Sequence, residues 1–199
     1  MIASRDGPSK EPVTKVHYSL RCWLGERGAA YGLKSVSESI LPSPHRMRRL
    51  RILAYSSVLA TYVLILVGGY VSASGSGLAC PDWPTCNGQI VPALTGHVLV
   101  EYTHRLLALL VSILVTGTWL VVSLRYRRER NIFVLSTASL VLLFAQVLLG
   151  MITVRTGLNA LVTASHLALA TGVFALVLVN ALLVRRRSQE FTQQPLLTA

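Results

Sequence analysis

Four long apolar runs constrain this chain more than any other feature of its sequence. They cover residues 52–72, 98–124, 132–154 and 160–184, and each is 21 to 27 residues long. At about 1.5 Å of rise per residue, a helix of that length crosses a hydrocarbon core roughly 30 Å thick. Lipid cannot satisfy free backbone groups, and none of the runs alternates as a barrel strand does. The sequence therefore predicts an all-α fold, a polytopic membrane four-helix bundle.

The low charge content excludes several classes of protein. Only 14% of the 199 residues are charged and 52% are hydrophobic, whereas soluble domains are about 25% charged. A soluble enzyme, a disulfide-rich secreted module and a disordered tail are excluded. The net charge of +11 would indicate nucleic acid in a soluble protein. Here the basic residues lie beside the apolar runs, so we expect membrane lipid as the surroundings and no nucleic-acid partner.

The arginines beside the runs predict how the chain crosses the membrane. Loop 73–97 contains no Lys or Arg, and the turn before the fourth run contains only Arg155. The other ends of the runs carry eleven arginines: Arg46, Arg48, Arg49, Arg51, Arg125, Arg127, Arg128, Arg130, Arg185, Arg186 and Arg187. Basic residues near span ends favour the cytoplasmic side. We expect a multi-pass cell-membrane protein with both termini cytoplasmic and the first and second outward loops extracytoplasmic.

Composition divides the chain into three parts. Residues 1–46 are polar and proline-containing, residues 47–187 hold the four spans, and residues 188–199 form a predicted cytoplasmic tail. The first part is predicted to be a disordered tail or to precede a true start at Met47, which an arginine-rich stretch follows. Its acidic residues disfavour a transit peptide. No function is assigned to it.

Two histidines in the predicted spans lie at equivalent depths. His104 is six residues beyond Val98, and His166 is six residues beyond Ala160. Their spans cross the membrane in the same direction, so both residues lie about 9 Å below the outer helix ends. Ionisable groups in a span are costly and therefore indicate function. The other polar residues of this kind are Glu101, Arg105 and the neutral Gln146.

A facing pair of imidazoles suits the axial positions of a haem iron, and helix bundles build such sites from facing helices. Ala108 and Ala170, each four residues beyond a histidine, leave room for a flat macrocycle on the same helix face. The alternative is that each histidine is a hydrogen-bonded bundle residue without a ligand. A di-iron site is excluded, because it needs more carboxylates than Glu101 supplies within the spans.

Three charged residues near the histidines are candidates for the same site. Glu101 lies one helical turn above His104, where a carboxylate can act as a base or stabilise positive charge on a reacting group. It could equally accept a structural hydrogen bond or pair with Arg105. Arg105 and Arg155 are candidates for contacts with haem propionates near the outer surface, and Arg155 could equally be an interfacial anchor.

Two cysteines lie in the first outward loop. Cys80 and Cys86 face an oxidising compartment in the predicted topology, where disulfides persist. The pair is predicted to be a structural disulfide or an exchangeable dithiol. A zinc site is weakly supported, because only Asp82 and His97 are available as further ligands.

Four sequence elements in order resemble the heme A synthase family. Residues 68–92 resemble the family's first outer loop, and they contain the string Gly-Ser-Gly-Leu-Ala-Cys-Pro-Asp-Trp-Pro-Thr-Cys-Asn-Gly at residues 75–88. Residues 101–105, Glu-Tyr-Thr-His-Arg, resemble its Glu-x-x-His-Arg element. Residues 146–154 resemble its third span, and His166 falls where the family has its next haem-ligating histidine. The resemblance covers roughly residues 50 to 184.

The resemblance implies an oxidoreductase reaction. Members of this family oxidise a methyl group of heme O to a formyl group, giving heme A for terminal oxidases. The route is thought to be two hydroxylations with water as the oxygen source, followed by dehydration of a diol. By this resemblance His104 and His166 are axial ligands of a haem (heme b, heme O or heme A). Glu101 assists at the substrate methyl, and Cys80 and Cys86 form a redox-active or disulfide-forming pair.

The resemblance is to half of the usual family member. The usual enzyme has eight spans in two similar halves, and this sequence resembles the first half. This implies either a homo-oligomer or a second half-length subunit, with heme O synthase and a terminal oxidase as further partners. The alternative function is a bis-histidine haem b protein of electron transfer or oxidase assembly without methyl oxidation. Such a protein would have little use for Glu101.

Overall fold

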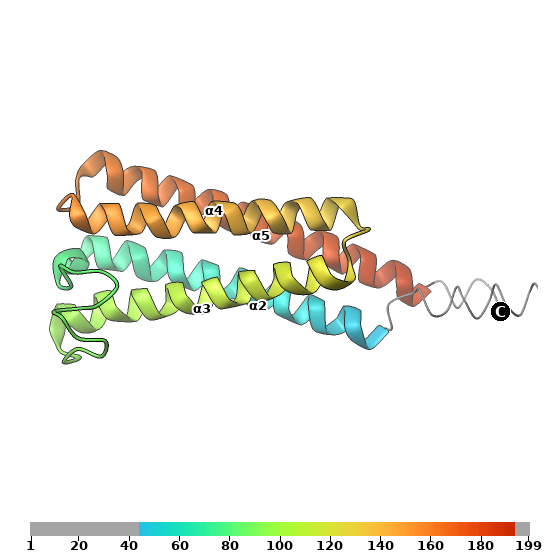
Figure 1. Ribbon diagram of the computed structural model, residues 1–199, viewed down its shortest axis with the longest axis horizontal. Helices are drawn as coiled ribbons and strands as arrows, with labels where there is room; N and C mark the ends of the chain where they lie inside the picture. Colours follow the sequence, from blue (N-terminus) through green and yellow to red (C-terminus); the bar gives the residue numbers. More distant parts are fainter. Residues whose placement is uncertain (1–43, 194–199) are drawn as a thin grey trace, which may run out of the picture. The chain divides into compact units, whose positions relative to one another are not determined.

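The computed structural model describes residues 44–193, with side chains over residues 46–190, and forms four long helices (Figure 1). The helices are α2 (Pro44–Ala73), α3 (Gly96–Arg125), α4 (Arg130–Arg155) and α5 (Ala160–Gln193), with a short 3-10 helix η1 (Ser76–Leu78) after α2. No strand occurs within 44–193. All four long helices are long and apolar enough to cross a membrane. The predicted all-α four-helix fold is therefore confirmed.

Two of the helices extend beyond the apolar runs by eight and nine residues. α2 begins at Pro44 and α5 continues to Gln193, whereas the runs begin at residue 52 and end at residue 184. The early start of α2 buries Met47 and Leu50, which pack with residues of α3 to α5 in a cluster at this end of the bundle. Burial of these two side chains stabilises the helix through the arginine-rich stretch. The predicted N-terminal extension (residues 1–46) and C-terminal tail (residues 188–199) therefore overlap the helices at residues 44–46 and 188–193. Their remaining residues, 1–43 and 194–199, lie outside the described residues.

Each helix packs against two neighbours. α2 and α4 each contact both α3 and α5, so α3 and α5 lie diagonally across the bundle. Successive helices are antiparallel neighbours, as in other up-and-down bundles. The two helices that carry His104 and His166 consequently run in the same direction and face each other across the bundle axis.

Large apolar side chains cover the outside of the bundle. Leu59, Phe144 and Leu161 are 65%, 67% and 76% exposed. A monomeric soluble protein rarely exposes so much contiguous apolar surface, whereas a lipid environment accommodates it. Inside, a second cluster formed by Val111, Val115, Leu143, Val173 and Val177 fills the middle of the bundle.

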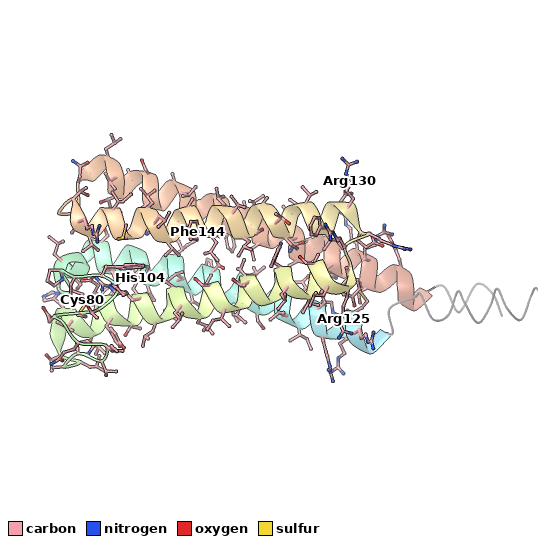
Figure 2. All side chains as sticks on the ribbon, viewed as in Figure 1. Cys80, His104, Arg125, Arg130 and Phe144 are labelled. Atoms are coloured by element: carbon pink, nitrogen blue, oxygen red, sulfur yellow. A yellow bond between two sulfur atoms is a disulfide. The ribbon has the colours of Figure 1, made fainter. Side chains whose placement is uncertain are left out.

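The two ends of the bundle differ in chemistry. Figure 2 shows Cys80 and His104 towards one end and Arg125 and Arg130 at the other. The disulfide loop, defined here as residues 74–95, and the α4–α5 turn share the first end, which we call the loop end. The arginine-rich segments at the start of α2, between α3 and α4, and near the end of α5 share the second end.

Candidate functional site

Each histidine lies against a glycine of the neighbouring antiparallel helix. A Cβ atom added to Gly68 of α2 would lie 2.9 Å from Cε1 of His104, and one added to Gly150 of α4 would lie 3.1 Å from Cε1 of His166. Both separations are shorter than ordinary van der Waals contact, so only glycine leaves the rings where they are. The α2–α3 pair and the α4–α5 pair therefore build the same histidine cradle.

The histidine rings retain unused hydrogen-bonding capacity. The Nδ1 atoms of His104 and His166 are buried and have no hydrogen-bond partner. Nε2 of His166 lies 3.4 Å from the side-chain nitrogen of Gln146, which donates to the backbone carbonyl of His166 at 3.0 Å. Buried polar atoms in native proteins are usually paired, so unpartnered imidazole nitrogens in glycine cradles fit a haem iron.

The zinc alternative receives no support from the described part of the chain. Within it, no group of three or more His, Cys, Asp or Glu residues could hold a metal ion. Cys80 and Cys86 are joined in a disulfide, and Nδ1 of His97 is hydrogen-bonded to Oγ of Ser76 at 2.8 Å. His97 therefore attaches η1 to the first turn of α3.

Glu101 is buried beneath the disulfide loop. Its side chain accepts a hydrogen bond from the backbone N–H of Cys80 at 2.7 Å and one from Nη2 of Arg105 at 2.6 Å. The residue is only 3% exposed. Both carboxylate oxygens thus accept a hydrogen bond, and one of the two donors is the backbone N–H of a cysteine of the disulfide.

Arg105 binds the disulfide loop as well as Glu101. Nη1 donates to the carbonyls of Asp82 and Thr85 at 2.8 and 2.7 Å, and Nη2 donates to the carbonyl of Cys80 at 2.7 Å. A guanidinium group presents five donors in a fixed fork, which suits it to several carbonyls at once. The ion pair between Arg105 and Glu101, which the sequence left open as one alternative, is present in the structure. No haem propionate is needed to explain the orientation of Arg105.

The disulfide loop is compact around two buried sulfurs. Cys80 and Cys86 are 0% and 1% exposed. Between them, the carboxylate of Asp82 accepts hydrogen bonds from Oγ1 of Thr85 and from the backbone N–H groups of Asn87 and Gly88. The hydrogen bond from Thr85 and those from the two backbone groups lower the pKa of Asp82 to about 2. A charged Asp82 therefore holds this turn closed at neutral pH.

The α4–α5 turn contacts the disulfide loop through one side chain. Leu158 lies against Gly77 of η1, where a Cβ would come within 3.1 Å of its Cδ2 atom. Asn159, next along the chain, accepts a hydrogen bond from the N–H of Leu161 and caps the start of α5. The helix that carries His166 is thereby positioned against the loop that carries the cysteines. Arg155, at the end of α4, is exposed.

The glycine cradles were not predicted from the sequence, although a signal exists there. Gly68 lies five residues before the end of α2, and Gly150 lies five residues before the end of α4. Both glycines thus lie at a depth close to that of the histidine on the next helix. A search for small residues level with His104 and His166 on the antiparallel neighbours would have found both.

Comparison with known proteins gives a family match over most of the described helices. The model of a family described as "Cytochrome oxidase assembly protein" matches residues 51–99 and 94–198. These ranges contain both histidine cradles, the disulfide loop, Glu101 and Arg105.

Individual relatives show the same similarity. A heme A synthase of Bacillus pumilus is 34% identical over an alignment of 145 residues that covers 69% of this chain and 46% of the relative. A heme A synthase of Bacillus licheniformis is 34% identical over an alignment of 154 residues that covers 72% of this chain and 50% of the relative. One from Symbiobacterium thermophilum is 32% identical over 154 residues, 77% of this chain and 48% of the relative. The chain spans about half the length of the curated relatives it matches.

Proposed function

Since the chain belongs to this family of cytochrome oxidase assembly proteins, we propose that it acts in heme A synthesis and oxidises a methyl group of heme O to a formyl group. The observation that carries the proposal is the pair of glycine cradles, each of which holds an imidazole with a buried, unpartnered Nδ1 atom. Heme A synthase relatives align with 69% and 72% of this chain.

In this proposal His104 and His166 hold a haem between the diagonal helices α3 and α5. A haem bound there supplies an iron centre able to exchange electrons. The protein holds the two imidazoles at a fixed depth, because Gly68 and Gly150 admit the rings and Gln146 contacts His166. Apolar helix surfaces around the site keep bulk water away.

Glu101 is the proposed proton acceptor at the substrate. Oxidation of a methyl to a formyl group removes electrons and protons from the carbon and adds one oxygen atom, for which we propose water as the source. A carboxylate one turn from His104 can take up a proton or stabilise positive charge at that carbon. The contacts with Cys80 and Arg105 hold the carboxylate in one orientation.

Cys80 and Cys86 are the proposed redox pair. Each of the two hydroxylations releases two electrons and two protons, and a disulfide accepts two of each when it is reduced to a dithiol. An external thiol–disulfide oxidant reoxidises the dithiol between the two hydroxylations, so that the pair accepts all four electrons in turn. The backbone of Cys80 contacts both Glu101 and Arg105, which couples the state of the loop to the residues near the substrate. For the haem propionates we favour Arg155 over Arg105, since Arg155 is exposed at the loop end whereas Arg105 is bound to the loop.

The proposal includes the placement of the protein and its partners. The loop end faces the extracytoplasmic side and both termini face the cytoplasm, because the arginine-rich segments share the opposite end. A second copy of the chain or a second half-length subunit completes the assembly. Heme O synthase supplies the substrate, and a terminal oxidase receives the product.

The test is a haem extraction with mass analysis on protein purified from cells that make heme O. We expect heme A or its hydroxylated precursor in the wild-type extract, and haem without either in the Glu101→Gln variant. Haem b alone in the wild type would overturn the proposal in favour of a bis-histidine electron-transfer protein. A preparation free of haem, with no absorbance change in His104→Ala, would contradict both functions.

A further inference from the structure

A small polar cavity lies inside the bundle, away from the histidines. All four long helices line it, with the residues Ala54, Ser57, Val115, Thr118, Ser136, Ser139, Val177 and Asn180. Thr118 is fourteen residues beyond His104, and Asn180 is fourteen residues beyond His166. At about 1.5 Å per residue, the cavity lies roughly 21 Å from the histidine level, towards the arginine-rich end. It is therefore separate from the candidate haem site.

Asn180 is the least satisfied group around this cavity. It is 4% exposed, its Nδ2 donates to Oγ of Ser136 at 2.9 Å, and its Oδ1 has no hydrogen-bond partner. An unpaired buried amide oxygen destabilises the folded protein. If the amide were turned by half a revolution, the unpaired group would be an N–H instead. In either orientation one polar atom of Asn180 lacks a partner.

The hydroxyl groups around the cavity can accept hydrogen bonds from a bound molecule, but most of their own protons are already donated to backbone carbonyls. Oγ of Ser57 donates to the carbonyl of Leu53, and Oγ1 of Thr118 donates to the carbonyl of Leu114, each at 2.9 Å. The two oxygens lie 3.3 Å apart. Each hydroxyl has a single proton, so with both protons on carbonyls this contact joins two acceptors. The oxygens of Ser57 and Thr118 can therefore both accept a hydrogen bond from a further donor.

Ser139 and Ser136 also have hydrogen-bonding capacity that a molecule in the cavity can use. Oγ of Ser139 donates to the carbonyl of Leu135 at 2.8 Å, so its lone pairs are also free. Ser136 accepts from Asn180, and its own proton is available to a new acceptor. The cavity thus suits a molecule that can donate two hydrogen bonds, one of them to the unpaired Oδ1 of Asn180, and accept at least one.

We propose that this cavity binds one ordered water molecule, which links the polar side chains of the helices that line it. The cavity has a volume of about 10 Å³, and one water needs roughly 10–15 Å³ and two to four polar partners. The water donates to Oδ1 of Asn180 and to the Ser57–Thr118 pair, and it accepts the proton of Ser136. A cation is disfavoured, because no residue that lines the cavity is charged and an uncompensated charge inside a bundle is costly.

The test uses solid-state NMR on the full chain in lipid bilayers, with isotope-labelled asparagine. Polarisation transferred from water protons should reach the side-chain amide of Asn180, at a depth that bulk water does not reach. Asn87, which is exposed in the disulfide loop, calibrates the transfer from bulk water. Absence of transfer to Asn180, with normal transfer to Asn87, would overturn the proposal.

Val115→Ile gives a second test, since it adds one methylene at a residue that lines the cavity. If water is bound there, the larger side chain displaces it, so the transfer to Asn180 is lost and the Tm falls. A Tm that rises, as expected when a dry cavity is filled, would contradict the proposal. Val111→Ile is the matched control, because Val111 is equally buried one turn away on α3 and does not line the cavity. It should leave the transfer to Asn180 unchanged.

Discussion

The imidazole of His104 lies directly against the α-carbon of Gly68, with only 2.9 Å between Cε1 and the position that a Cβ atom on Gly68 would occupy. The position of the ring thus depends on a residue without a side chain, on another helix. The contact repeats between His166 and Gly150. Two antiparallel helix pairs, α2–α3 and α4–α5, build the candidate haem site by the same means.

Replacement of Gly68 by alanine should displace the His104 ring and weaken haem binding. Overpacking of this kind costs about 1–3 kcal/mol, and each 1.4 kcal/mol corresponds to about tenfold in affinity. The measurement is the haem content of the purified protein, from its Soret absorbance. Gly69→Ala is the matched control, because nothing lies within 4 Å of a Cβ built at Gly69. Equal haem content in both variants would contradict the role of Gly68 in positioning His104 for haem binding.

Arg105→Gln should destabilise the protein by roughly 3 kcal/mol, the lower end for breaking a buried ion pair. The change leaves the buried carboxylate of Glu101 without its cation, and the loop carbonyls lose charged donors. The measurement is the free energy of unfolding from a detergent titration. Because the two residues contact each other, Glu101→Gln combined with Arg105→Gln should cost less than the sum of the single changes. Strict additivity would show that the pair is uncoupled.

Acidification should open the disulfide loop through Asp82. Its pKa is about 2 in the folded protein and 3.8 without these contacts. The lowered pKa stabilises the closed loop fully above pH 3.8, and this stabilisation is lost as the pH falls through about 2. The measurement is the rate at which a phosphine reduces the Cys80–Cys86 disulfide. Relative to Asp82→Asn, the wild-type rate should rise over this pH interval, and parallel pH profiles would exclude the role of Asp82.

The paired change Cys80→Ser and Cys86→Ser should lower the heme A yield while the haem content is retained. The reason is that the proposed redox pair is lost, whereas the histidine cradles are built by other residues. The measurement is the ratio of heme A to total haem in extracts. Asp82→Asn is the control, because it loosens the loop and keeps both sulfurs. An unchanged ratio in the serine variant would leave the disulfide with a structural role alone.

The sequence predicted the fold most successfully in the segments that cross the hydrocarbon core of the membrane. The four apolar runs predicted four helices, since no other backbone conformation satisfies its own hydrogen bonds within a single lipid-exposed segment. The prediction was less successful at the helix ends. α2 and α5 continue beyond the apolar runs, because residues such as Met47 and Leu50 bury side chains against other helices. Such burial depends on neighbours that are distant in the sequence.

The same distinction, between what one segment determines and what depends on distant neighbours, applies to the polar residues. The sequence by itself determined that His104 and His166 lie at similar depths, because helical rise fixes depth from residue number. Only the tertiary structure decided that each ring lies against a glycine, that Arg105 binds the disulfide loop, and that Asn180 borders a polar cavity. Those contacts depend on the rotation of each helix about its axis. That rotation is set by the packing of all four helices together, which no single segment encodes.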